Sequence, residues 1–138
     1  MNQQKIALDS CVVIDIIEKP GVAKSLKSKF KGKSIKIILC DVVLGEVNRV
    51  RGYVPEKVIS KLSQLLGKEI GLSTSNEQSI SNANQISEQF QICHNGDNKI
   101  LSLCQAKDYV LVTFDRMLLK TCEFLGVAAF HPSMAGGI

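Results

Sequence analysis

Short apolar runs alternate with longer amphipathic stretches along the chain. The apolar runs are too short for helices and rich in branched side chains, so we expect them to be buried strands. Strands are predicted at 6–8, 35–40, 109–114 and 127–130, with a further short one at 70–73. In the other stretches apolar residues recur every three or four positions, which is typical of helices with one buried face. Helices are predicted at 11–19, 22–30, 42–50, 55–66, 77–90, 98–106 and 117–125.

This order predicts an α/β fold, a three-layer α/β/α sandwich with a central parallel β-sheet. Strands that are covered by helices on both faces are apolar throughout, as these are. A chain of 138 residues suits one domain. We expect a single domain over 1–138, with its core at about 5–132 and a frayed tail at 133–138.

Composition narrows the class of protein. Hydrophobic residues make up 45% of the chain and charged residues 22%, which is ordinary for a globular domain. The five cysteines include no C-x-x-C pair, which excludes a zinc knuckle. We expect them to be small buried hydrophobes in a reducing compartment. No apolar run approaches the length of a membrane span, so we predict a cytoplasmic protein with no membrane partner.

Three aspartates directly follow predicted strands: Asp9, Asp41 and Asp115. Ligands of open α/β sheets bind outside the carboxyl ends of the strands, which makes these positions informative. Each aspartate also has a simpler interpretation, as the N-cap of the helix that follows it. For Asp41 the capping interpretation is preferred.

Glu46 lies inside an apolar helical stripe. Val42 and Val50 are four residues away on either side, so the carboxylate should be at least partly buried. A buried carboxylate needs a cation or strong donors. Arg49, one turn further on, is one partner, and a metal ion is the other.

Asp97 stands where the helix at 98–106 begins. Leu101 and Cys104 follow it at helical spacing, so its carboxylate should project toward the sheet. The helix dipole could by itself account for an acid there, but Asn95 is an equally good cap.

Four acids from four separate elements can thus meet at one edge of the sheet. Mg²⁺ and Mn²⁺ prefer oxygen ligands, and metals held by carboxylates suit phosphate-ester cleavage. The hydroxyls of Ser10 and Thr113 could support a carboxylate or a metal-bound water. The four acids are Asp9, Glu46, Asp97 and Asp115.

No glycine-rich phosphate loop follows any strand, so nucleoside triphosphate use is unsupported.

Four motifs, in this order, resemble those of PIN-domain ribonucleases. They are Lys-Ile-Ala-Leu-Asp-Ser at 5–10, Val-x-x-Glu at 43–46, Asp-x-x-Ile-Leu-x-x-Cys at 97–104 and Leu-Val-Thr-Phe-Asp-Arg-x-Leu at 111–118. The resemblance implies that these four acids are catalytic, bind one or two Mg²⁺ or Mn²⁺ ions and hydrolyse RNA, with Ser10 and Thr113 in support. Phe114, Met117 and Cys11 depart from the family pattern, which puts a fifth ligand position in doubt.

The resemblance leaves the biological role open. Some members resemble VapC toxins, which pair with an antitoxin, and others resemble archaeal ribosomal-RNA processing nucleases. A non-catalytic scaffold that binds RNA or protein is the third alternative, and a homodimer is usual in the family. The compact chain favours the toxin.

The net charge of +4 comes from one stretch that contains six lysines and no acid. Without it, the rest of the chain is slightly acidic. These lysines could contact RNA phosphates that an acidic site cannot attract, or they could be a solvated helix face. They are Lys24, Lys27, Lys29, Lys31, Lys33 and Lys36.

Overall fold

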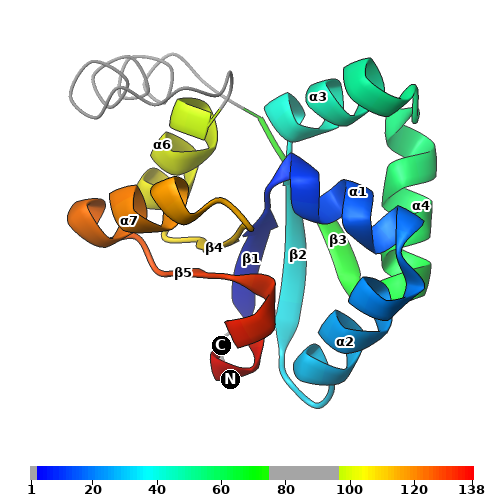
Figure 1. Ribbon diagram of the computed structural model, residues 1–138, viewed down its shortest axis with the longest axis horizontal. Helices are drawn as coiled ribbons and strands as arrows, with labels where there is room; N and C mark the ends of the chain where they lie inside the picture. The colour runs from blue at the N-terminus through cyan, green and yellow to red at the C-terminus, as the bar shows by residue number, and fades with distance from the viewer. Residues whose placement is uncertain (1–2, 75–96) are drawn as a thin grey trace.

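The structure is a computed structural model that describes residues 3–74 and 97–138, without the side chain of Asp97. The helix predicted at 77–90 therefore lies outside the described residues. Within them the structure is an α/β sandwich with the predicted parallel sheet at its centre (Figure 1).

The sheet has five strands in the order β3-β2-β1-β4-β5, and every neighbouring pair is parallel. Its central strand, β1, pairs on one side through Ile6 with Ile37 and on the other through Ala7 with Leu111. All four of these side chains are fully buried, as strands covered on both faces require. The strands are β1 (Gln4–Leu8), β2 (Ile35–Cys40), β3 (Glu69–Ser73), β4 (Val110–Val112) and β5 (Ala129–Phe130).

The described helices form two groups. Helices α1 to α4 pack against one another, whereas α6 packs with α7. Right-handed crossovers from β1 through β2 to β3 place the first group on one face, and the return to β4 and β5 places the second on the other. Figure 1 shows the two groups on either side of the strands. The helices are α1 (Ser10–Glu18), α2 (Pro20–Phe30), α3 (Asp41–Arg51), α4 (Pro55–Leu66), α6 (Asp97–Lys107) and α7 (Arg116–Leu125).

The sheet changes direction between β1 and β4. From β1 the chain proceeds to β2 on one side, and from β4 it proceeds to β5 on the other. The connections therefore diverge at the carboxyl ends of these two strands, which is the usual place for a ligand in such folds.

At the C-terminus, where we expect a frayed tail, the chain forms a 3-10 helix, η1 (Pro132–Gly137), in which Ala135 is fully buried. Lys29 Nζ donates to the carbonyl of Pro132 at 3.0 Å, and Lys33 Nζ donates to that of Gly136 at 2.6 Å. The sequence did not predict this packing, because the lysines lie about a hundred residues before their acceptors.

Three cysteines are buried as expected, and the same expectation is wrong for Cys11, which is exposed in the first turn of α1. Burial raises the pKa of Cys40 to about 11 and that of Cys122 to about 12, so both stay neutral thiols. Cys104 is also buried, and burial raises the pKa of its thiol. In the described ranges, no helix is both long and apolar enough to cross a membrane.

We expect Leu62→Ala to destabilise the domain by about 2–5 kcal/mol, because it leaves a cavity under α4 where Leu62 is fully buried. Urea denaturation measures the change. The matched control, Lys61→Ala on the exposed face of the same helix, should stay within about 0.5 kcal/mol of the wild type. Equal effects of the two substitutions would contradict the assignment of this face to the core.

Candidate functional site

Asp9 lies at the carboxyl end of β1, beside β4. It follows β1 directly and has only 7% of its surface exposed. Its Oδ1 accepts from the backbone N–H of Ser10 at 2.8 Å, so it caps α1 as the simpler interpretation predicts. Its Oδ2 accepts from Thr113 Oγ1 at 2.7 Å. Two donors thus satisfy the buried carboxylate without a cationic side chain among them.

Thr113 links the first aspartate to the third. Its hydroxyl donates to Asp9 and accepts from the backbone N–H of Asp115 at 3.1 Å. Asp115 in turn caps α7, because its Oδ1 accepts from the backbone N–H groups of Met117 and Leu118. The fully buried threonine fixes the loop after β4 relative to β1.

Glu46 reaches the same edge from α3 and is half-buried, as its place in the apolar stripe predicts. Ser10 Oγ donates to its Oε1 at 2.9 Å. Within the described residues no ion pair joins Glu46 to Arg49. Its observed partner is a hydroxyl beside Asp9, which brings the second acid to the first.

The neighbouring acids add to the cost of ionising Asp9. Burial raises the pKa of Asp9 above its ordinary value of 3.8, and the charges of Glu46 and Asp115 add to that shift. The bonds from Thr113 and Ser10 act in the opposite direction and do not cancel it. A carboxylate in these surroundings is stabilised by a positive charge.

The donors fit a hard divalent cation in their chemistry. Carboxylate and hydroxyl oxygens are what Mg²⁺ and Mn²⁺ prefer, and both ions keep several waters as further ligands. Among the described side chains, no three acid, histidine or cysteine groups already form a set that could hold an ion. The predicted fourth acid, Asp97, is the first residue of α6, and its side chain lies outside the description.

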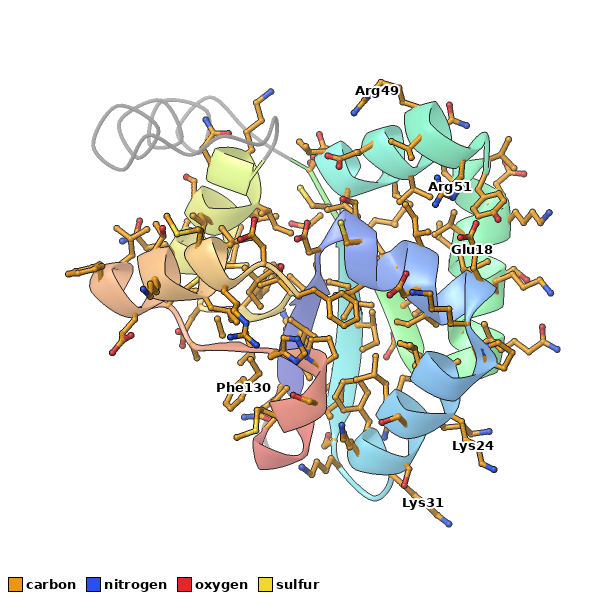
Figure 2. The ribbon with its side chains drawn as sticks, viewed as in Figure 1. Glu18, Lys24, Lys31, Arg49, Arg51 and Phe130 are labelled. Atoms are coloured by element: carbon orange, nitrogen blue, oxygen red, sulfur yellow. The ribbon has the colours of Figure 1, made fainter. Side chains whose placement is uncertain are left out.

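The remaining predicted residues are Asp41 and the six lysines. Asp41 is the first residue of α3 rather than its N-cap, and its exposed carboxylate accepts from the backbone N–H of Val42. The lysine-rich stretch leads into the amino end of β2, so it lies at the opposite edge of the sheet. In Figure 2, Lys24 and Lys31 project from the end of the molecule opposite α3.

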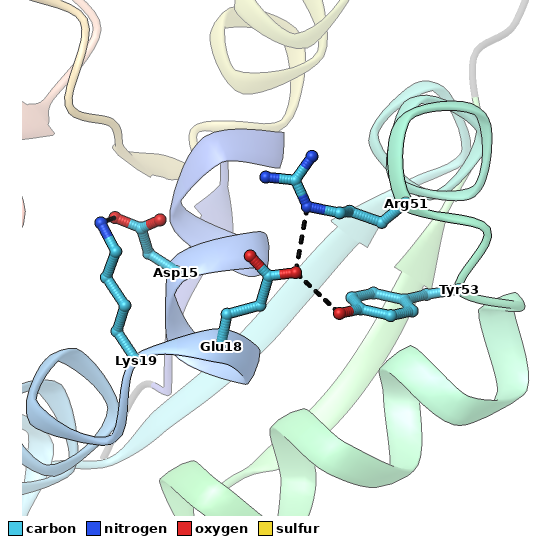
Figure 3. A network of polar contacts seen from close by, with 5 residues as sticks. All are labelled: Asp15, Glu18, Lys19, Arg51 and Tyr53. Atoms are coloured by element: carbon cyan, nitrogen blue, oxygen red, sulfur yellow. Dashed lines mark hydrogen bonds and ion pairs between the residues drawn. The ribbon is translucent and has the colours of Figure 1, made fainter.

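A second set of bonds ties α1 to α3, which sequence reasoning missed. Glu18 Oε2 accepts from Arg51 Nε at 3.0 Å and from Tyr53 Oη at 2.7 Å (Figure 3). These bonds lower the pKa of Glu18, led by the one from Tyr53, and raise that of Tyr53. Ser10–Glu46 joins the same helices near the site, so α1 is bonded to the α3 segment near both of its own ends.

No protein-family model matches the sequence, and no curated protein matches it. The fold does match solved structures. VapBC2 from Rickettsia felis bound to a DNA fragment from its promoter has a TM-score of 0.66 at 18% identity, over 93% of this chain and 98% of that one. VapBC-1 from nontypeable Haemophilus influenzae has a TM-score of 0.66 at 14% identity, over 94% of this chain and 99% of that one. FitAcB from Neisseria gonorrhoeae has a TM-score of 0.57 at 16% identity, over 94% of this chain and 99% of that one.

At these identities the likeness establishes the fold. The chain has the PIN-like α/β fold that its four motifs indicate, with the sheet and its covering helices matched over nearly the whole length.

In the presence of chelator, we expect the free energy of unfolding of Asp9→Asn, relative to that of the wild type, to increase as the pH rises above 3.8. A raised native pKa makes the protonated form of Asp9 the stabilising one, and that contribution is lost as pH rises through the native value. Thermal melts of both proteins across the acid range measure the difference. Asp108→Asn, at an exposed position that Asn tolerates at φ 58°, is the control and should show no such trend. A flat difference for Asp9→Asn would contradict the burial of an ionised carboxylate.

Proposed function

We propose that this chain is a Mg²⁺- or Mn²⁺-dependent endoribonuclease that hydrolyses RNA phosphodiester bonds. The observation that carries the proposal is the hydroxyl-linked cluster of Asp9, Glu46 and Asp115 at the switch point of a PIN-like sheet. Asp97 is proposed as the fourth acid, on the motif that it opens.

One or two ions would be held by Asp9, Glu46, Asp97 and Asp115. When bound, the metal supplies a nucleophilic water at neutral pH and charge stabilisation for the phosphate. The chain's own residues keep the ligands in place: Thr113 orients the Asp9 carboxylate and Ser10 orients that of Glu46. Hydroxyl donors of this kind fix the orientation of ligating carboxylates. Glu46 and Asp115 are only half-buried, so the cluster is open to a substrate on one side.

We also propose that the nuclease is the toxin of a toxin–antitoxin pair. Its partner would then be an antitoxin protein, and its location the cytoplasm. Support comes from the matched folds, which belong to VapBC and FitAB complexes. We expect a small reading frame next to this gene. The product of that frame should copurify with the chain and suppress cleavage. Without such a frame, an RNA-processing role becomes the better assignment.

RNA cleavage tests the proposed site directly. With Mn²⁺, the substitutions Asp9→Asn and Asp97→Asn should each lower the cleavage rate by roughly 100-fold or more, and chelator should abolish cleavage by the wild type. Asp108→Asn, at the amino edge of the sheet, is expected to cleave like the wild type. Equal cleavage by all variants would refute the site. Chelator-insensitive binding without cleavage would instead support a non-catalytic scaffold.

Divalent cations should also stabilise the fold. An ion that binds only the native state adds RT ln(1 + [L]/Kd), about 2.7 kcal/mol at a concentration of 100 Kd. We therefore expect millimolar Mn²⁺ to raise the Tm of the wild type and to raise that of Asp9→Asn less. Identical shifts in the two proteins would show that the ion binds elsewhere.

A further inference from the structure

A basic groove of about 400 Å³ opens between the ends of α2 and α4, at the edge of the sheet opposite the acids. Lys24, Lys27 and Lys31 line it from the side of α2, and Lys68 lines it from beyond α4. No acidic residue is among those that line it. The stem of Lys27 crosses toward α4, since a Cβ built on Gly67 would lie 3.7 Å from Lys27 Cε.

The structure separates the six lysines of this stretch into two sets. Lys29 and Lys33 donate to carbonyls of η1 and the residue after it, and Lys36 pairs with Glu69 at 3.6 Å. These three have structural roles. The other three are exposed and face the groove, so the charge available to a partner is concentrated there and not along the whole stretch.

The helix dipole does not account for all of this second set. Basic residues complement the partial negative charge at a helix C-terminus only within the last turn. In α2 the last turn contains Lys27 and the C-cap residue is Lys31, whereas Lys24 lies in an earlier turn. Three like charges around one groove repel one another, and a polyanion in the groove would relieve that repulsion.

The groove and the acids are separated by the length of the sheet. Asp9 follows the carboxyl end of β1, and Lys31 lies shortly before the amino end of β2, which runs parallel to it. A strand of five or six residues spans on the order of 17–20 Å. A stacked strand advances about 3.4 Å per phosphate, so an RNA needs about six nucleotides or more to reach both places.

We propose that this groove binds the phosphate backbone of the RNA substrate at a point remote from the bond that is cut. The proposal rests on the proposed ribonuclease function and adds a second contact with the same RNA, at the far edge of the sheet. Lysines act as point charges on phosphates without reading sequence. The groove has no aromatic side chain on which a base could stack, and its one large apolar residue, Leu66, is only 1% exposed. These features favour a backbone over bases or an apolar peptide.

Binding in the absence of metal tests the groove separately from cleavage. We would measure fluorescence anisotropy in chelator with a labelled stem-loop RNA of about the size of a transfer RNA. The triple variant Lys24→Gln, Lys27→Gln, Lys31→Gln should bind the stem-loop at least about tenfold more weakly than the wild type. Its slope of log affinity against log salt should be smaller by about 2–3, one unit for each lost phosphate contact.

A charge-matched control distinguishes RNA binding in the groove from general electrostatic attraction to the protein. The variant Lys61→Gln, Lys107→Gln, Lys120→Gln removes three exposed charges elsewhere and should bind the stem-loop like the wild type. Equal losses in the two triple variants would overturn the proposal, as would unchanged binding by the groove variant. Binding of a labelled oligoglutamate peptide without binding of RNA would assign the groove to an acidic protein segment instead. Cleavage in Mn²⁺, measured separately, decides the ribonuclease function, and there the groove variant should raise KM for the stem-loop and leave kcat unchanged.

Discussion

The carboxylate of Asp9, buried where the sheet changes direction, is the constraint on which the rest of the site depends. A buried acid needs donors, and the fold supplies them from two elements: the backbone of α1 and the hydroxyl of Thr113. Thr113 also holds the loop that carries Asp115. Ser10, next to Asp9, bonds Glu46. Satisfying one carboxylate therefore organises the positions of two more.

These acids serve two purposes that do not compete. Asp9 and Asp115 cap the helices that follow them, which accounts for their place at strand ends without any function. Capping does not, however, account for a third carboxylate at Glu46 or for the raised pKa of Asp9, both of which cost stability. Charge of the other sign lies at the opposite end of the domain, in the groove between α2 and α4. The molecule thus separates an edge suited to cations from an edge suited to polyanions.

The sequence predicted the strands of the sheet and the partial burial of Glu46, because both depend on local pattern. Continuously apolar runs identified β1 and β2, and the stripe around Glu46 predicted its partial burial. Contacts between distant segments were not predictable in this way. Arg51 and Tyr53 meet Glu18, and Lys33 meets the C-terminal turn, through side chains that no periodicity relates. For the same reason the six lysines form one basic segment in the sequence, whereas in the fold three of them contact other parts of the domain and three line the groove.

The central claim is that the oxygen atoms around Asp9 bind a divalent cation. A crystal grown with Mn²⁺ and measured at a wavelength where manganese scatters anomalously tests it most directly. The account predicts an anomalous peak bounded by the carboxylates of Asp9 and Glu46, with Asp97 or Asp115 completing the site. A protein that cleaves RNA in Mn²⁺ but shows no peak there, or shows one only elsewhere, would contradict it.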